Sequence, residues 1–328
     1  MDASLLDRGN SAIVSAMNIL VTGGAGFIGS HTCERLVRAG HRVRVADNLS
    51  TGKRSNLASV AGDIELIELD IRDFEKLRAA TSSMEAIVHL AAVASVVRSI
   101  EEPLATQAIN ATGSLNVIEA ARLEEVRRVV LASSAAIYGD DPVLPTTEDS
   151  PIRPITPYAW QKLSSEFYGQ FYGAQHGTEF LSLRYFNVYG PRQDPVSPYS
   201  GVLSIFTERA TGGRPLIIYG DGRQTRDFIH VSDVAEINRL GVEATWPLPQ
   251  IINVATGRET QIIDAARIIL EAAGAADADG CIEFEPARPG DIRRSFATGE
   301  LMVKTFGYRP QVAVAAGLEE LVALQQDG

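Results

Sequence analysis

Three residues of types that can transfer protons follow one another along the chain. Ser134 comes directly after an apolar run, and Tyr158 and Lys162 stand four residues apart just after Pro157. Proline is favoured in the first turn of a helix, and residues four apart share a helix face, so Tyr158 and Lys162 are expected side by side. A Tyr-x-x-x-Lys pair also occurs by chance on many helix surfaces, so its context must decide whether it marks a site.

This trio suits acid–base chemistry on a hydroxyl group. A free tyrosine has a pKa of about 10, which is too high for an efficient base near neutrality. The ammonium group of Lys162 would stabilise the phenolate of Tyr158 and lower the pKa of the phenol, and a positively charged cofactor ring would add to this effect. Ser134 could hydrogen-bond the reacting oxygen and stabilise the charge that develops there. The trio therefore predicts proton transfer beside a bound cofactor.

A glycine-rich turn upstream indicates which kind of cofactor. Residues 18–22 form a short apolar run typical of a buried parallel strand, and helical spacing begins at Phe27. Between and just beyond them, Gly23, Gly26 and Gly29 permit a tight bend, close approach to a pyrophosphate and close packing of helix on strand. The Gly-x-x-Gly-x-x-Gly spacing is one residue off the usual dinucleotide fingerprint. We predict a dinucleotide site, with its phosphates at the helix N-terminus.

An acidic residue at the end of the second expected strand narrows the choice of cofactor. Asp47 follows the strand expected at 41–46. A carboxylate there can accept hydrogen bonds from the adenosine ribose and would repel a 2′-phosphate, which favours NAD over NADP. The alternative is a turn aspartate that opens segment 47–52. The same two interpretations apply to Asp70, which ends the strand expected at 64–69.

Composition limits the class of protein. The chain has 328 residues, 45 % of them hydrophobic, which is enough for a large core. Its net charge of −11 argues against non-specific binding to nucleic acid or to an anionic membrane surface. The longest apolar stretch, near 86–97, is too short to span a bilayer, so we expect a cytoplasmic protein. The two cysteines and five histidines show no metal-ligand spacing, so no metal is expected.

The order of elements predicts an α/β protein built on a doubly wound parallel sheet. Strands are expected near 18–22, 41–46, 64–69, 86–90, 128–132 and 180–185, with helices between them. We predict an N-terminal extension at 1–16 that is disordered, a cofactor-binding domain of 17–186 and 225–257, and a smaller, discontinuous α/β substrate domain of 187–224 and 258–328. Ligands of such folds bind at the carboxyl ends of the strands, so the cleft between the two domains is the expected site.

Together these motifs resemble the extended short-chain dehydrogenase/reductase family, and within it the NAD-dependent nucleotide-sugar epimerases. The likeness extends from Met17 to about Tyr308. Its motifs are residues 22–29, 47–52, 89–92, 110–113, 133–139, 183–187 and 226–228, and Tyr158 with Lys162. The resemblance implies a Rossmann-type fold and epimerisation at C4 of a nucleotide-diphosphate sugar, with UDP as the expected nucleotide, through a transient 4-keto intermediate.

The resemblance also implies roles for particular residues. The catalytic residues would be Ser134, Tyr158 and Lys162. The NAD contacts would be Gly23, Gly26, Phe27, Ile28, Gly29, Asp47, Asn48, Ser50, Gly52, Asp70, Ile71, Ala91, Ala92, Asn110, Ser133, Tyr158, Lys162 and Tyr185. The substrate contacts would be Ser95, Ser134, Asn187, Tyr219, Arg226, Arg288, Asp291 and Ser295. Helices near 101–122 and 158–176 match the family's dimer surface, so a homodimer is expected.

Two departures from the family pattern bear on the substrate and the reaction. Ala135 and Ala136 stand where dehydratases of the family carry an acidic pair and where decarboxylases usually keep a glutamate, so these two activities are less favoured. Ser295 stands where epimerases restricted to plain hexoses usually carry tyrosine. The smaller side chain predicts that UDP-GlcNAc and UDP-GalNAc are interconverted, with UDP-Glc and UDP-Gal as a further pair. The motifs also leave open a dTDP-sugar epimerase, a reductase, or a non-catalytic NAD-binding regulatory protein.

Overall fold

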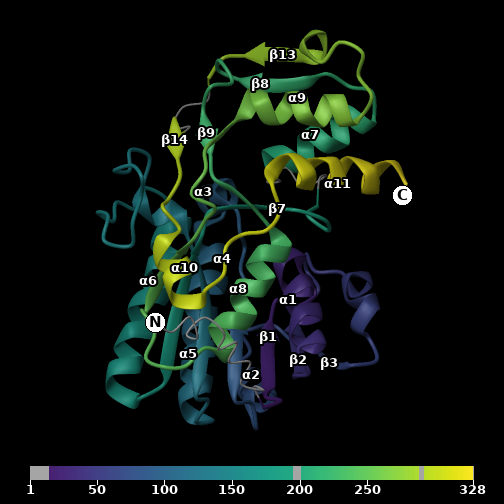
Figure 1. The fold of residues 1–328 in the computed structure, drawn as a ribbon. Coiled ribbons are helices and arrows are strands. Elements are labelled where there is room, and N and C mark those ends of the chain that lie inside the picture. Colours follow the sequence, from purple (N-terminus) through teal and green to yellow (C-terminus); the bar gives the residue numbers. More distant parts are fainter. Residues whose placement is uncertain (1–14, 195–200, 288–291, 328) are drawn as a thin grey trace, which may run out of the picture.

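A seven-stranded parallel sheet forms the centre of the protein (Figure 1). The structure is a computed structural model that describes residues 15–194, 201–287 and 292–327, so most of the extension expected at 1–16 lies outside the described residues. The strands are β1 (Asn18–Thr22), β2 (Arg42–Asp47), β3 (Ile64–Glu68), β4 (Ala86–His89), β5 (Arg128–Ser134), β6 (Glu179–Tyr185) and β11 (Ile251–Val254). Their order is β3-β2-β1-β4-β5-β6-β11, and all neighbours are parallel. This confirms the predicted Rossmann-type sheet, although β11 was not among the expected strands.

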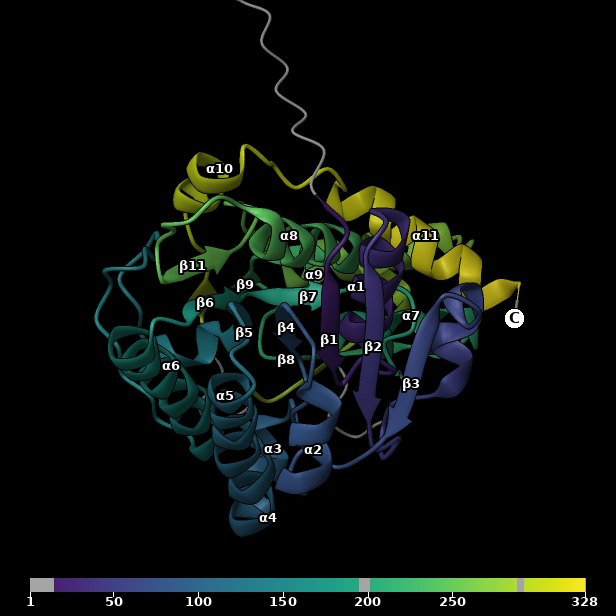
Figure 2. The ribbon, with the colours of Figure 1, turned by 90° about the horizontal axis from the view of Figure 1, so that it is seen from below.

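Helices cover both faces of the sheet (Figure 2). On one face lie α1 (Phe27–Arg38) and α8 (Val231–Glu243), and on the other α2 (Phe74–Thr81), α5 (Ser114–Leu123) and α6 (Pro157–His176). Side chains alternate between the two faces: Ile19 and Val21 of β1 join the core under α1 and α8, whereas Leu20 joins the core under α2 and α5. The near-continuous apolar strands follow from this burial on both sides.

The helical stretch expected near 101–122 is interrupted. It consists of α4 (Pro103–Gln107), a π-helix, η2 (Ala108–Gly113), and then α5, and it is preceded by α3 (Val96–Glu101). Pro103 separates α3 from α4 because proline has no N–H to continue the preceding helix. Single π-helical turns often occur at functional sites, and Asn110 lies on this one.

Short strands and helices form a smaller part above the carboxyl ends of the sheet strands (Figure 1). Strand β7 (Asn187–Tyr189) pairs with β10 (Phe228–His230), and β8 (Leu216–Tyr219) with β13 (Ile282–Glu285). Strand β9 (Thr225–Arg226) lies between β12 (Thr260–Gln261) and β14 (Arg294–Ser295). This part also contains α7 (Val202–Thr211), α9 (Ile262–Ala272), α11 (Val314–Gln326) and the 3-10 helix η4 (Asp279–Cys281). Three other elements pack on the sheet part: α10 (Glu300–Phe306) and the 3-10 helices η1 (Arg54–Val60) and η3 (Ala135–Tyr138).

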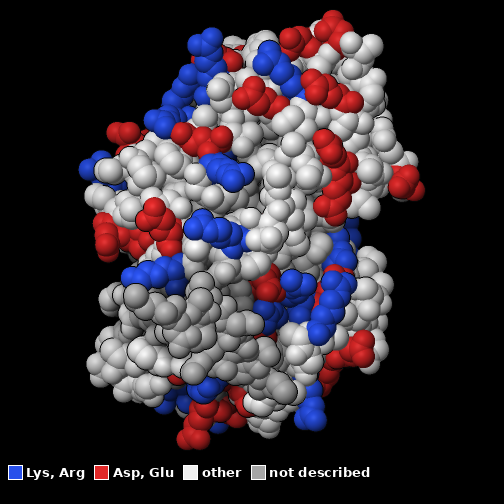
Figure 3. Space-filling view, viewed as in Figure 1, with Lys and Arg blue, Asp and Glu red and all other residues white. Residues whose placement is uncertain are grey.

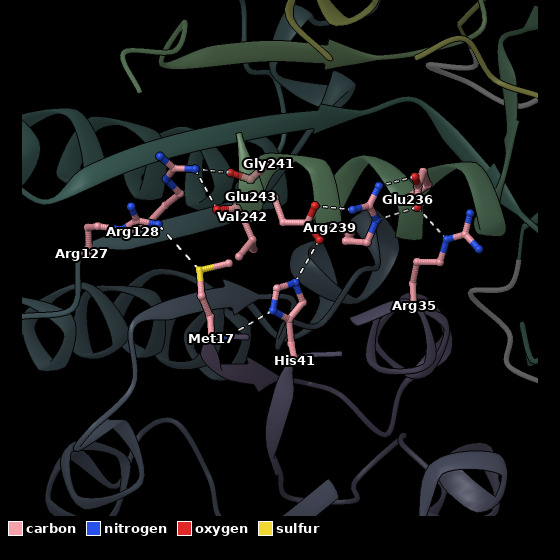
Figure 4. Close-up of polar contacts among 10 residues, drawn as sticks. All are labelled: Met17, Arg35, His41, Arg127, Arg128, Glu236, Arg239, Gly241, Val242 and Glu243. Carbon is pink, nitrogen blue, oxygen red and sulfur yellow. Dashed lines mark hydrogen bonds and ion pairs between the residues drawn. The ribbon is translucent and has the colours of Figure 1, made fainter. Parts of the chain in front are cut away.

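Polar contacts anchor α8 to the sheet and to α1 (Figure 4). The buried Arg128 guanidinium donates to the carbonyl oxygens of Gly241 and Val242, at the C-terminal end of α8, where a cation is favourable. The His41 ring accepts a hydrogen bond from the Met17 backbone N–H and donates to Glu243 at 2.9 Å. Helix α8 is thereby tied to the residue before β2 and to the first residue of β5.

Charged side chains are distributed in a mixed pattern on the face drawn in Figure 3. Lys and Arg there are interspersed with Asp and Glu, over both the sheet part and the smaller part. Within the described ranges, no helix is both long and apolar enough to cross a membrane.

Candidate active site

The glycine turn between β1 and α1 is packed so closely that side chains would not fit. Gly23 has a φ of +70°, and a Cβ added there would lie 2.7 Å from the backbone nitrogen of Ala91. A Cβ on Gly29 would lie only 2.1 Å from the carbonyl oxygen of Gly23. Helix α1 begins with Gly26 as N-cap, without a side-chain cap and without an acidic residue in its first turn. Its first amide groups therefore remain available to an anion, and the turn fits the diphosphate of NAD.

Asp47 lies at the end of β2, next to this turn. Its carboxylate accepts hydrogen bonds from the backbone nitrogens of Ala25 at 2.9 Å and Leu49 at 2.8 Å. Gly52 packs against it, since a Cβ there would approach the carboxylate to 2.9 Å. A carboxylate has about four acceptor positions, so two remain for ribose hydroxyl groups. The structure thus shows Asp47 as a turn aspartate next to the glycine turn, and its contact with the cofactor stays a prediction.

Asp70 lies at the end of the neighbouring strand β3. Its carboxylate accepts from the side chain of Asn48 at 2.9 Å and from the Arg72 guanidinium at 2.7 Å. The hydrogen bonds from Arg72 hold the pKa of Asp70 well below its usual range. The side chain of Asn48 also accepts a hydrogen bond from the backbone nitrogen of Ser50. Ser50 is exposed. Ile71, the residue after Asp70, is buried. Ionised Asp70 thus lies on the same edge of the sheet as Asp47.

The structure brings Ser134, Tyr158 and Lys162 together at the carboxyl end of β5. Helix α6 starts at Pro157 with Thr156 as a hydrogen-bonding N-cap, so Tyr158 lies in its first turn. The Lys162 ammonium group is 6.0 Å from the centre of the Tyr158 ring. It also donates a hydrogen bond to the backbone carbonyl oxygen of Ala132 on β5, at 2.9 Å.

Burial shifts the pKa values of both α6 residues. Burial raises the pKa of the Tyr158 phenol, and a hydrogen bond with Ser134 acts in the opposite direction. Burial lowers the pKa of Lys162 to about 8, so the ammonium form still predominates at neutral pH. In the protein alone, desolvation thus outweighs the hydrogen bond with Ser134 in its effect on the pKa of Tyr158. The lowered pKa that a base requires depends on additional positive charge.

Hydrogen bonds within the protein connect His89 to β1, and Asn110 both to the segment after β4 and to α6. His89 lies 2.7 Å from the hydroxyl group of Thr22, and burial lowers its pKa to about 3, so it stays neutral. The Asn110 side chain donates to Gln161 of α6 at 2.8 Å and accepts from the backbone nitrogen of Val93 at 2.8 Å. Asn110 therefore ties the segment after β4 to α6. Ala91 and Ala92 are half-buried in that segment.

A cavity lies at the carboxyl ends of β5 and β6. Five residues predicted to contact the ligands line it, from separate parts of the chain: Ser134, Tyr185, Asn187, Arg226 and Ser295. Ligand contacts were not predicted for the lining residues Ala135, Ala136, Tyr138, Gly139, Pro142, Thr146, Phe186 and Ile292. Tyr138 and Gly139 belong to a motif that was recognised, so their position could have been inferred. Pro142 and Thr146 reach the cavity through a loop that carries no motif.

Other predicted contacts lie elsewhere. Ser95 is the N-cap of α3 and accepts a hydrogen bond from the backbone nitrogen of Arg98. Tyr219 is the last residue of β8. The hydroxyl group of Ser133 donates a hydrogen bond to Glu166 of α6. These three residues do not line the cavity described above. Arg288 and Asp291 lie outside the described residues.

The turn, the Tyr–Lys pair and the Rossmann-type sheet together define an extended short-chain dehydrogenase/reductase. The chain belongs to the NAD dependent epimerase/dehydratase family, which it matches over residues 19–255. It is therefore an enzyme that works with NAD, and the family resemblance seen in the sequence is confirmed.

Similar proteins are known over nearly the whole chain. It is 40% identical to the UDP-glucose 4-epimerase of Mycolicibacterium smegmatis, over 93% of this chain and 97% of the relative. The structure of UDP-glucose 4-epimerase from Thermotoga maritima with UDP-glucose has a TM-score of 0.89 and 38% identity, covering 95% of this chain and 99% of that one. A UDP-N-acetylglucosamine 4-epimerase from Methanobrevibacter ruminantium M1, in complex with UDP-N-acetylmuramic acid, has a TM-score of 0.88 and 35% identity, covering 94% and 97%.

Proposed function

We propose that the protein is a UDP-sugar 4-epimerase in which Tyr158 moves the proton of the C4 hydroxyl group. The observation that carries this proposal is the convergence of Ser134, Asn187, Arg226 and Ser295 on one cavity. Tyr158 and Lys162 do not line this cavity, but Ser134 connects it to the pair through its hydrogen bond with Tyr158. The names of the relatives agree with this reaction. A cytoplasmic location remains a prediction.

Four residues of the chain have separate roles in the proposed reaction. Bound NAD would supply the hydride acceptor and donor and, in its oxidised form, a positive charge. Tyr158 takes the C4 hydroxyl proton and later returns it, while Ser134 hydrogen-bonds the same oxygen. Lys162 contributes a positive charge near the phenolate, since its ammonium group is 6.0 Å from the centre of the Tyr158 ring. Arg226 is a cation in the cavity lining, of the type that suits a diphosphate.

The cavity lining argues against both elimination and decarboxylation. A UDP-N-acetyl-alpha-D-glucosaminuronate decarboxylase and a dTDP-glucose 4,6-dehydratase are among the similar proteins. Elimination of water requires an additional acid and base at the sugar. In this chain Ala135 and Ala136 line the cavity directly after Ser134, and neither can exchange a proton.

Incubation of the purified protein with a panel of UDP- and dTDP-sugars, followed by NMR of the products, tests the proposal. An epimerase interconverts two sugars without net formation of NADH. A reductase would consume reduced cofactor in proportion to product, and a regulatory protein would bind NAD and convert nothing. Either result would replace the proposed function.

The size of Ser295 supports acetylated UDP-sugars as substrates, because this half-buried side chain lines the cavity where tyrosine would occupy space. Ser295→Tyr is expected to lower kcat/KM for UDP-GlcNAc by roughly 10- to 100-fold and to leave that for UDP-Glc nearly unchanged, since the added ring excludes a 2-acetamido group. Steady-state kinetics on both sugars measure this, with Ser295→Ala as the control. Equal losses on both sugars, or no loss, would contradict the assignment of Ser295 as the gate.

A homodimer is the second part of the proposal. Trp160, Phe167 and Phe171 of α6 are 60%, 62% and 50% exposed, and on the neighbouring helices Ile100 and Leu104 are 60% and 85% exposed. Exposed apolar side chains this large on adjacent helices are typical of an interface. A second copy of the same surface would cover them by two-fold symmetry.

The double variant Trp160→Asp/Phe167→Asp is expected to convert the dimer into a monomer, because it would place charges inside the paired apolar surface. Light scattering after size exclusion measures the mass. The control is Leu324→Asp on α11, which replaces another exposed apolar residue, 52% exposed, away from α6. A wild-type mass equal to one chain would refute the dimer.

A further inference from the structure

Three polar residues form a row across the ends of neighbouring sheet strands. Ser133 on β5 is in register with Arg184 on β6, and Arg184 with Asn253 on β11. All three are buried. They precede Ser134, Tyr185 and Val254 by one residue each, so their side chains lie on the opposite face of the sheet, toward α6.

Glu166 of α6 binds two members of this row. Arg184 donates from Nε to one carboxylate oxygen at 2.9 Å and from Nη2 to the other at 2.8 Å, and the Ser133 hydroxyl group also donates to Glu166. The side chains of Arg184 and Glu166 are 1% and 2% exposed. A bidentate pair of this kind is directional, and loss of one partner leaves an uncompensated buried charge.

Glu166 lies four residues after Lys162 and eight after Tyr158, on the same buried side of α6. One turn further on, Gly169 brings the helix close to β5, since a Cβ there would lie 2.9 Å from a methyl group of Leu131. Two neighbouring turns of α6 thus make close contacts with the sheet. These contacts determine how far the helix lies along β5 and how it is rotated.

The same arginine reaches the cavity wall. Arg184 Nη1 donates to the hydroxyl group of Tyr138 at 2.8 Å, and that hydroxyl group donates to Asn253 at 2.7 Å. The guanidinium carbon lies 5.1 Å from the centre of the Tyr138 ring, and Tyr138 lines the cavity. One ion pair therefore connects the helix that carries the Tyr–Lys pair with the wall of the ligand cavity.

We propose that Glu166 and Arg184 are positioning residues for the reaction, and that their buried ion pair sets where Tyr158 and Lys162 lie relative to Ser134. This inference rests on the proposed function, because it assigns to these residues the alignment of the proton-transferring groups. Both act through other residues. A displacement of about 1 Å between reacting groups can lower a rate by about two orders of magnitude.

The first test compares this ion pair, which joins β6 to α6 near the carboxyl end of the strand, with an ion pair between β5 and β6 at the other end of the strands. Arg128 and Glu179 are in register at the start of β5 and β6 and form an ion pair at 2.7 Å. Glu166→Gln is expected to lower kcat by roughly 10- to 100-fold with KM changed less than about twofold. Glu179→Gln is expected to keep the wild-type kcat even if its Tm falls. Equal effects of both variants on kcat would overturn the proposal.

The second test separates alignment from stability. A buried ion pair can often be replaced by apolar residues of similar volume without loss of stability. Glu166→Leu/Arg184→Met is therefore expected to have a higher Tm than Glu166→Gln, while kcat remains low. Recovery of kcat together with Tm would show that the pair only stabilises the fold, and it would overturn the proposal.

A third measurement does not depend on turnover. Hydrogen–deuterium exchange of residues 157–163 is expected to be faster in Glu166→Gln than in wild type, and unchanged in Glu179→Gln. Equal exchange in both variants would overturn the proposal. A wild-type protein that converts no UDP-sugar would refute the proposed function, and the exchange comparison would still decide whether Glu166 holds the start of α6 in place.

Discussion

Tyr158→Phe is expected to lower kcat for sugar interconversion by about 10²- to 10⁴-fold, which is the usual contribution of a positioned acid–base group. The substitution removes only the hydroxyl group, and the ring can keep its place above Lys162. NAD and UDP-sugar binding should therefore persist, with KM changed little. Measurement of initial rates by NMR or by a coupled assay, together with titration of NAD, checks both parts.

Tyr168→Phe on the same helix is a suitable control for this variant. Tyr168 packs against the core between α6 and the sheet and is not part of the cavity lining. It should keep the wild-type rate. If Tyr158→Phe turns over as fast as the wild type, Tyr158 is not the proton-transfer group and the proposed function loses its mechanism.

Gly29→Ala is expected to abolish NAD binding and to destabilise the protein by about 3 kcal/mol or more, because overpacking of a rigid site is costly. The added methyl group would lie 2.1 Å from the Gly23 carbonyl oxygen and 2.7 Å from the Gly24 Cα, and neither backbone atom can move without opening the turn. Thermal unfolding and the amount of NAD that copurifies with the protein measure the two effects.

Gly62→Ala provides the matched comparison. Gly62 lies in an exposed turn, and a Cβ added there would meet no heavy atom within 4 Å. Its Tm and its NAD content should stay close to the wild-type values. A Gly29→Ala protein that copurifies with a wild-type amount of NAD would show that the turn tolerates a side chain and is not the diphosphate site.

Local patterns were sufficient to predict most of the sheet. Six of the seven strands begin and end within two residues of the predicted positions. The central strands are largely apolar because they are buried on both faces, whereas β2 and β3 alternate apolar with charged residues. The four residues of β11 are too few for a clear pattern, and they follow a segment rich in proline. The interruption of the helical stretch by the π-helix at 108–113 was not predicted either, since nothing in the spacing of apolar residues marks it.

The candidate site was predictable only in part. Tyr158 and Lys162 could be paired from their spacing, because a helix alone brings residues four apart together. The convergence of Pro142, Thr146 and Ile292 on the cavity depends on segments that carry no recognised motif.

The sequence by itself determined the Rossmann-type fold, the dinucleotide turn and the Tyr–Lys pair, because each is indicated by patterns within short stretches of the chain and by the order of those stretches. Only the tertiary structure decided which distant residues meet. Glu166 and Arg184 each look like an ordinary charged residue in the sequence, yet they form a buried ion pair because α6 packs across β5 and β6. The physical reason is that a buried charge is tolerated only beside its partner, and the fold decides which partner is within reach.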